Sequence, residues 1–158
     1  MSSKKRSLDP ELSAGYQVRR CHRRFDRLLN AYLARRGLKS GFWYYLRILW
    51  IEDGLSQKTL SDRTNVTENT TATIISAMVK DGLVERARDT EDKRKLRVDL
   101  TSRGKALEAE LMGNAFEINR IAAEGIAADE VAICLSVLRR MSDNLAIAFD
   151  ELADRPVA

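Results

Sequence analysis

Two groups of side chains between residues 67 and 95 have the chemistry and the spacing to bind a nucleic acid. Members of the first group are short, polar and spaced as on one face of a helix: Asn69, Thr70, Thr73 and Ser76. Such side chains let a helix lie close to base edges in a major groove. The second group is the charged run RDTEDKRK at residues 88–95, whose cations suit a phosphate backbone or a minor groove. Together the two groups predict binding to duplex DNA.

Basic residues in and before the charged run are expected to supply most of the salt-dependent affinity, because phosphate contacts carry that part of the binding free energy. These residues are Lys58, Arg88, Lys93, Arg94 and Lys95. The short polar side chains of Asn69, Thr70 and Thr73 are expected to discriminate between bases.

Two helices should position the polar group. Ser56 is placed to cap a short helix whose Leu60 points inward and which ends in a polar turn around Asn65. Thr67 is the expected cap of the second helix. The buried face of that helix is predicted from the three-and-four spacing of Thr71, Ile74, Ile75 and Met78.

Two strands should flank the charged run. Gly82 is expected to end the second helix, and Leu83 and Val84 begin the first strand. Residues 96–100 alternate between apolar and polar, which is typical of a half-buried partner strand. A helix, a turn, a second helix and a two-stranded ribbon, in this order, indicate a winged helix-turn-helix.

This segment resembles the MarR family of bacterial transcription regulators, whose wing has an Asp-x-Arg pattern before a strand that ends in Leu-Thr, with a Gly soon after. The matching residues are Asp92-Lys93-Arg94, Leu100-Thr101, Gly104 and the run DGLVER at residues 81–86. The resemblance implies that Arg94 enters the minor groove and that Asp92 helps to orient it. It also implies repression that a ligand relieves.

The first helix is predicted over residues 10–36, with Asp9 as its cap and Pro10 at its first position. One face is apolar, and the other carries five arginines: Arg19, Arg20, Arg23, Arg24 and Arg27. Like charges at this spacing repel one another along a helix, so an anionic partner is expected. Acidic residues of the last helix, DNA phosphates and an anionic small molecule all fit that description.

The last two helices should run from Thr101 to about Glu124 and from about Asp129 onward, with a break at Gly125. The last helix carries a heptad-like apolar seam: Val131, Leu135, Leu138, Leu145, Phe149 and Leu152. A lone terminal helix needs no such seam, so a homodimer is expected. The predicted fold is mainly α with a small β wing, a winged helix-turn-helix lobe (37–105) joined to a helical dimerisation region built from both chain ends (1–36 and 106–158).

A ligand cleft is implied by the resemblance, between the dimerisation helices and the DNA-binding lobe. Its candidate lining residues are Arg19, His22, Arg23, Trp43, Tyr44 and Arg47, which offer aromatic walls and cations for a carboxylate. An anionic aromatic compound or an aryl-CoA thioester is the expected effector. Two alternatives stay open: an effector-free architectural DNA-binding protein, and a regulator that senses oxidants through a cysteine.

Charge and composition agree with a DNA-binding protein. Among the 158 residues, 44% are hydrophobic, which favours one globular domain. Residues 1–36 carry a net charge of +7 and residues 106–158 a net charge of −6, so a polyanion is drawn to the first part and repelled by the last. No apolar run reaches the roughly 18 residues of a membrane span, and residues 1–10 lack the apolar core of a signal peptide, so a cytoplasmic location is expected.

Catalysis is not indicated. The chain has one histidine, no nucleophile-elbow or phosphate-loop glycine pattern and no cluster of metal ligands, so neither a cofactor nor a metal is expected. Cys21 and Cys134 form no metal-binding or redox pair motif, and both are expected to be packed, free thiols.

Overall fold

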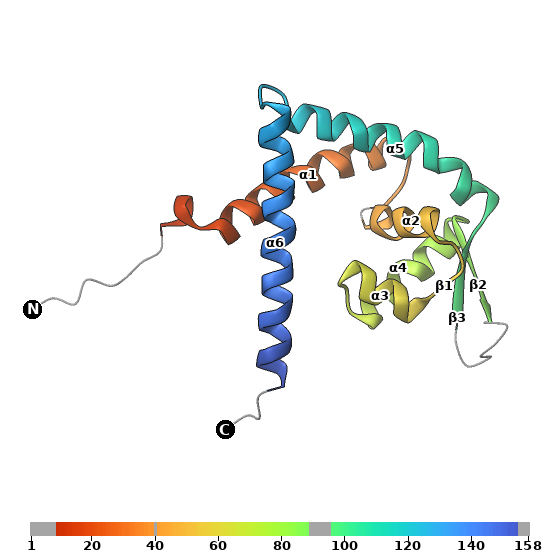
Figure 1. The fold of residues 1–158 in the computed structure, drawn as a ribbon. Coiled ribbons are helices and arrows are strands. Elements are labelled where there is room, and N and C mark those ends of the chain that lie inside the picture. The colour runs from red at the N-terminus through yellow and green to blue at the C-terminus, as the bar shows by residue number, and fades with distance from the viewer. Residues whose placement is uncertain (1–8, 40, 89–95, 155–158) are drawn as a thin grey trace, which may run out of the picture. The chain divides into compact units, whose positions relative to one another are not determined.

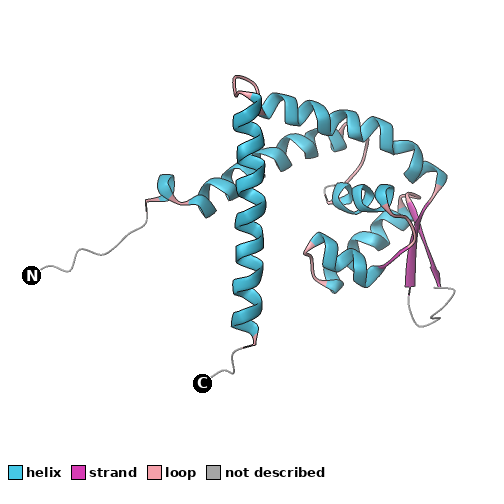
Figure 2. Cartoon of the chain, in the orientation of Figure 1, coloured by secondary structure: helices cyan, strands magenta, loops and turns pink. Residues whose placement is uncertain are grey.

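The computed structural model describes residues 9–39, 41–88 and 96–154 (Figure 1). It divides into two compact units, Met1–Ile118 and Asn119–Ala158. The described residues are mainly helical with one small antiparallel sheet, as the sequence predicts (Figure 2). In chain order the elements are the 3-10 helix η1 (Pro10–Leu12), α1 (Ala14–Ala34), α2 (Phe42–Ile51), β1 (Leu55–Ser56), α3 (Gln57–Thr64), α4 (Glu68–Lys80), β2 (Val84–Arg88), β3 (Leu96–Leu100), α5 (Ser102–Ala122) and α6 (Ala128–Ala153).

The start of the first helix differs from the prediction. Asp9 caps only the short helix η1, where its carboxylate accepts a hydrogen bond from the Glu11 amide at 2.9 Å. The backbone then turns extended at Ser13, whose hydroxyl accepts from the Tyr16 amide and caps α1. Two cap residues four positions apart therefore compete for the helix start, and the later one begins the long helix.

The helix-turn-helix forms through local caps that the sequence predicts. Ser56 Oγ accepts from the Thr59 amide at 3.0 Å, and Thr67 Oγ1 accepts from the Thr70 amide at 3.4 Å. Between the two helices Asn65 adopts φ +54°, a left-handed conformation that asparagine tolerates better than most residues. Gly82, at φ +69°, follows the cap residue of α4, as predicted.

The sheet has three strands rather than the expected two. Its order is β1-β3-β2, with Leu55 opposite Val98 and Arg86 also opposite Val98 on the other side. The Asp53 carboxylate prolongs the edge by accepting a hydrogen bond from the Leu100 amide at 2.8 Å. A strand of two residues is too short to show an alternating pattern, so the sequence gives no sign of β1.

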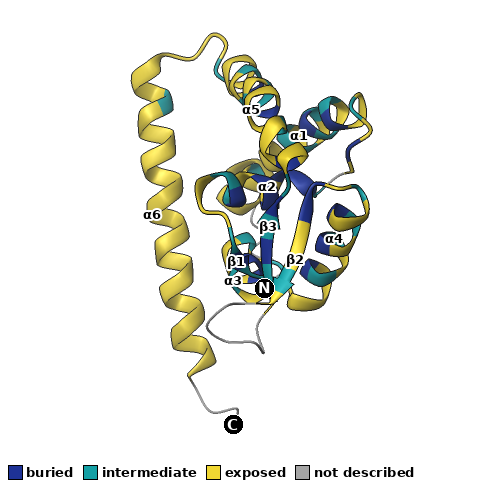
Figure 3. Ribbon diagram, turned by 90° about the vertical axis from the view of Figure 1, so that its right-hand side faces the viewer, coloured by how far each residue is buried: buried dark blue, intermediate teal, exposed yellow. Residues whose placement is uncertain are grey.

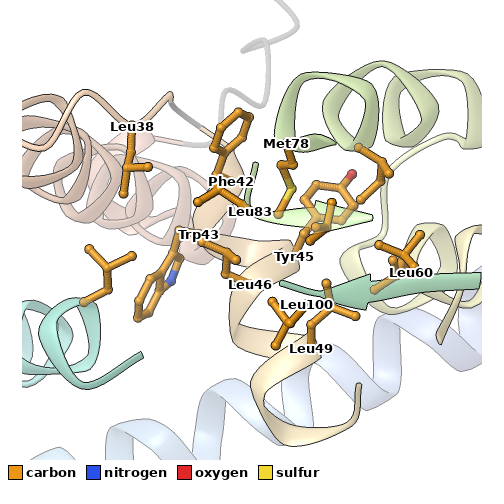
Figure 4. Packing of buried hydrophobic residues seen from close by; sticks show 14 of the residues in the cluster. Leu38, Phe42, Trp43, Tyr45, Leu46, Leu49, Leu60, Met78, Leu83 and Leu100 are labelled. Carbon is orange, nitrogen blue, oxygen red and sulfur yellow. The ribbon is translucent and has the colours of Figure 1, made fainter. Parts of the chain in front are cut away.

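Helix α2 supplies the centre of the hydrophobic core (Figure 4). Its buried residues include Phe42, Tyr45, Leu46 and Leu49. Figure 4 shows residues of α2 close to Leu60 of α3, Met78 of α4, Leu83 just before β2 and Leu100 at the end of β3. Trp50 is half-buried, and its indole Nε1 donates to the Gly104 carbonyl oxygen at 3.0 Å. The core therefore ties the helix-turn-helix to α2 and to the start of α5.

The buried hydroxyl of Tyr45 should contribute measurably to stability. It lies 3.0 Å from Thr71 Oγ1, and Thr71 is fully buried on the inner face of α4. Tyr45→Phe is expected to lower the free energy of unfolding by about 1–2 kcal/mol, because it leaves a buried hydroxyl without its partner. Urea denaturation checks this value, and the double variant Tyr45→Phe/Thr71→Val should recover part of the loss. A single variant as stable as wild type would contradict the expectation.

Helix α6 buries almost nothing within the chain. No residue of α6 is classed as buried, and Figure 3 shows it coloured as exposed along nearly its whole length. The large apolar side chains that stay exposed on it are Ile133, Leu135, Val137, Leu138, Met141, Leu145, Ile147, Phe149 and Leu152. Cys134 is exposed on this helix, and Cys21 is exposed on α1, so the prediction of two packed thiols is wrong for the chain by itself. Apolar spacing predicts a buried face on both helices, whereas these positions are exposed among the described residues of a single copy.

Candidate DNA interface and ligand site

The outer face of α4 presents short polar side chains, as the sequence predicts. Asn69, Thr70, Thr73 and Ser76 are all exposed, opposite the buried face formed by Thr71, Ile75 and Met78. The hydroxyl of Thr73 donates to the Asn69 carbonyl oxygen at 3.1 Å, and that of Ser76 donates to the Ala72 carbonyl oxygen at 2.7 Å. Because each hydroxyl proton is used within α4, the two oxygens are left mainly as acceptors, and that of Ser76 already accepts from Arg86 Nη2 at 3.0 Å.

Asn69 and Thr70 differ in whether their side chains already form hydrogen bonds within the protein. Within the described residues the side-chain amide of Asn69 has no hydrogen-bond partner, so its donor and its acceptor are both free for a base edge. This is the group that suits the N6 and N7 atoms of adenine. Thr70 Oγ1 accepts from Thr67 Oγ1 at 3.0 Å and is thereby part of the α4 cap.

The predicted phosphate-binding residues fall into three situations. Lys58 Nζ lies 3.7 Å from Asp62 and 3.6 Å from Glu68, so two carboxylates oppose its charge and compete with a phosphate. Arg88 is exposed at the end of β2. The remaining phosphate-binding candidates, Lys93, Arg94 and Lys95, lie outside the described residues, as does Asp92, which was predicted to orient Arg94.

One basic residue of this region was missed. The Nη2 atom of Arg86, on β2, shares its two protons among three acceptors: Gln57 Oε1 at 3.1 Å, the Ala72 carbonyl oxygen at 2.9 Å and Ser76 Oγ at 3.0 Å. It therefore connects β2 to α3 and to the middle of α4. The strand alternation places Arg86 on the same face as Arg88, which was the signal available in the sequence.

The arginine face of α1 lines a hollow of about 490 Å³. Its lining residues are Tyr16, Arg19, Arg20, Arg23, Arg24 and Arg27. Arg20 is 3.5 Å from Glu11, whereas Arg19, Arg23, Arg24 and Arg27 form no ion pair within the part of the chain that is described. Two of the predicted ligand residues, Arg19 and Arg23, thus lie together in a strongly cationic hollow.

His22 and Tyr44, also predicted, meet at a carboxylate that was not predicted. His22 Nε2 lies 3.2 Å from Asp26 Oδ2, and the Tyr44 hydroxyl donates to Asp26 Oδ1. Burial, this hydrogen bond and the negative charge of Asp26 raise the pKa of Tyr44 to about 12, against a smaller opposite effect from Arg47. Tyr44 is therefore a protonated phenol at neutral pH, with its proton directed to Asp26.

Trp43 and Arg47 complete the predicted ligand residues. Trp43 is buried, with its ring edge-on to Trp50 at 5.9 Å, and the guanidinium carbon of Arg47 lies 6.0 Å from the centre of the Trp43 ring. Arg47 is exposed, whereas a ligand could stack on Trp43 only if the core opened. Arg47 and Tyr44 are thus the accessible members of the α2 group.

Neither a metal centre nor a membrane span is seen in the described parts of the chain. No three His, Cys, Asp or Glu side chains there are grouped to hold a metal ion. The helices found in those same ranges are too short or too polar to cross a bilayer.

A helix-turn-helix with an exposed polar second helix, followed by a β-hairpin, defines a winged helix-turn-helix DNA-binding protein. Residues 41–96 match the model of the MarR family. The chain is 31% identical over 131 residues to the HTH-type transcriptional repressor YetL of Bacillus subtilis (strain 168), a match that covers 81% of this chain and 78% of YetL. The chain belongs to the MarR family, and it is a DNA-binding transcription regulator and not an enzyme.

Solved structures agree with this assignment. A MarR transcriptional regulator from Methanosarcina mazei Go1 has 30% sequence identity and a TM-score of 0.77, covering 84% of this chain and 96% of that one. The PcaV transcriptional regulator from Streptomyces coelicolor, solved in complex with its natural ligand, has 27% identity and a TM-score of 0.76, covering 87% and 96%. The predicted fold class is confirmed by these structures.

Proposed function

We propose that the protein is a repressor that binds a palindromic operator as a homodimer and releases it when an anionic aromatic ligand binds. The observation that carries the DNA part is the outer face of α4, where the Asn69 amide, which has no partner among the described residues, is exposed together with Thr73. The repressor YetL among the relatives supports the direction of control.

A homodimer is supported by α6, because its exposed apolar side chains would be covered by a second copy. Two copies related by a two-fold axis would place two α4 helices in major grooves about one helical turn apart, roughly 34 Å. DNA selected from a random pool by the purified protein should therefore contain two inverted half-sites at that spacing. Enrichment of a single half-site, or of no sequence at all, would argue against the proposal.

Ligand control is supported by two cationic features and by one relative. The arginine hollow on α1 and the exposed Arg47 on α2 can attract a carboxylate, and Tyr44 beside Arg47 offers an aromatic surface. The structure of PcaV contains its natural ligand. A ligand can shift the protein away from DNA only by its differential affinity for the two arrangements of the dimer.

Thermal-shift measurements with paired compounds test the ligand class. Benzoate-type acids and aryl-CoA thioesters should raise the melting temperature and release the selected duplex, whereas the matched neutral benzamides should do neither. Arg47→Gln should weaken the effect of the acids while leaving DNA binding intact. If no acid or thioester acts and the duplex still binds, an effector-free architectural protein becomes the better description. Release by peroxide that Cys21→Ser abolishes would instead identify a redox-sensing regulator.

Arg94 is expected to contribute strongly to operator affinity. Arg94→Ala should weaken binding to the selected duplex by about 1–3 kcal/mol and lower the slope of log affinity against log salt by about one, because one phosphate or minor-groove contact is lost. Fluorescence anisotropy at several salt concentrations measures both quantities. Arg63→Ala is the matched control, since Arg63 pairs with Glu52 at 2.6 Å near the C-terminal end of α3. A folded Arg94→Ala protein with unchanged affinity would exclude the minor-groove role.

A further inference from the structure

We propose that Arg86 is a positioning residue for sequence recognition: its bonds to Gln57, Ala72 and Ser76 fix the rotation of α4 about its own axis. The inference rests on the proposed binding of DNA through the outer face of α4. It adds a residue that lies on the wing strand and contacts the recognition helix, so the two DNA-binding elements are not independent.

The attachment point on α4 is the reason for this role. The Ala72 carbonyl oxygen and the Ser76 hydroxyl lie 2.7 Å apart, because Ser76 follows Ala72 by one helical turn and donates to it, so Arg86 is attached to α4 at one place. Thr73 follows Ala72 directly, and Asn69 lies one turn before Thr73, so these base-facing residues lie close to the attachment on one side of it. Any rotation of α4 that moves Asn69 and Thr73 also stretches the bonds to Arg86.

The core packing of α4 cannot supply the same restraint by itself. Its inner face contacts the core through Thr71, Ile75 and Met78, all fully buried. Apolar contacts are non-directional and set how deeply the helix lies, whereas hydrogen bonds weaken steeply with angle. The inner face has one directional contact of its own, between Thr71 and Tyr45, and the bonds of Arg86 add a second one outside the core.

The guanidinium of Arg86 forms no ion pair within the described residues. Its three acceptors are neutral. A plain phosphate contact is therefore the rival role. The two roles differ in outcome, because a phosphate contact weakens binding to every DNA sequence equally, whereas a positioning role weakens binding to the selected sequence alone.

The test compares the selected duplex with a scrambled duplex at several salt concentrations. Arg86→Lys keeps the charge but is one atom shorter, so the ammonium falls short of the three acceptors. It should lower affinity for the selected duplex by about tenfold, with scrambled-duplex affinity and salt slope unchanged. Arg63→Lys should change neither affinity. Equal losses on both duplexes, or no loss on either, would overturn the proposal.

A second variant tests the contact without altering Arg86. Gln57→Met removes one acceptor and should reduce selected-duplex affinity in the same direction but by less. Combined with Arg86→Lys it should add no further loss, because both changes break one network. Additive losses would contradict that network. If Arg86→Lys does not fold, Gln57→Met alone tests whether the contact with Arg86 affects affinity for the selected duplex.

Amide hydrogen exchange in the free protein separates this inference from the proposed function. Arg86→Lys should speed exchange over α4, Glu68–Lys80, relative to Arg63→Lys. If wild type selects no DNA sequence, the proposed function fails while the restraint on α4 is still measured. Unchanged exchange over α4 would overturn the restraint whatever the DNA result.

Discussion

The substitution Gly104→Ala is expected to lower the free energy of unfolding by about 2–3 kcal/mol, the upper part of the range seen when a larger side chain is placed in a closely packed site. A Cβ atom at Gly104 would lie 2.1 Å from the Leu83 carbonyl oxygen, 3.1 Å from the Leu83 carbonyl carbon and 3.0 Å from Leu100 Cδ2. The nearest obstacle is backbone, which cannot swing aside as the end of a flexible side chain can. Either α5 or the segment at Leu83 must move.

Several hydrogen bonds oppose that movement. The Leu83 carbonyl oxygen accepts from the Thr101 amide at 3.1 Å, and the Thr101 hydroxyl is 2.7 Å from the Gly82 carbonyl oxygen. The Gly104 amide donates to Thr101 Oγ1 at 3.1 Å, and the Gly104 carbonyl oxygen accepts from Trp50. Shifting α5 away from Leu83 would lengthen these bonds together, so relief of the clash is costly.

Gly113→Ala is the matched control for this substitution. Gly113 is also in α5, but a Cβ there would meet nothing within 4 Å. Alanine at 113 should raise stability by about 0.5–1 kcal/mol, because glycine is the weaker helix former. Urea denaturation of the two variants gives the comparison. Equal stability of Gly104→Ala and wild type would show that the close approach to Leu83 does not exist in solution.

The parts of the fold predicted from the sequence are those fixed by neighbouring residues. Ser56 and Thr67 each cap a helix through an amide three positions on, and Thr71 and Met78 face the core because one helical face carries them. Strand β1 could not be predicted, because it exists only through pairing with β3, about forty residues away in the sequence. Helix caps and buried helix faces depend on residues a few positions apart and can be predicted from the sequence. Strand pairing between distant residues cannot be predicted in this way.

The candidate site divides in the same way. Exposure of Asn69 and Thr73 follows from the helical period, whereas one of the two ion pairs of Lys58 depends on Glu68 in the next helix. Asp26 was missed because it lies among arginines on α1. Its role as the acceptor for the Tyr44 hydroxyl depends on the packing of α2 against α1. Arg86 was missed for the same reason, since its acceptors come from two other helices.

The double substitution Leu145→Glu/Phe149→Glu is expected to convert the protein to a monomer and to abolish tight operator binding. The two side chains are 71% and 70% exposed and lie one helical turn apart on the seam of α6. Burying a leucine or a phenylalanine contributes about 1.5–3 kcal/mol, and a two-fold symmetric interface counts each substitution twice. The four substituted side chains of a dimer would therefore remove about as much free energy as holds together a dimer with a micromolar Kd, which is about 8 kcal/mol.

Operator affinity should fall with the dimer, because a single lobe keeps only one half of the contacts. Sedimentation velocity at micromolar concentration gives the mass, and anisotropy with the selected duplex gives the affinity. Ser136→Glu is the control: it adds a carboxylate at an exposed position of α6, on the side opposite Leu145, and should leave both values unchanged. If Leu145→Glu/Phe149→Glu remains a dimer, a partner other than a second copy covers the seam. Tight operator binding by a monomeric double variant would instead show that one lobe is enough and that the operator need not be palindromic.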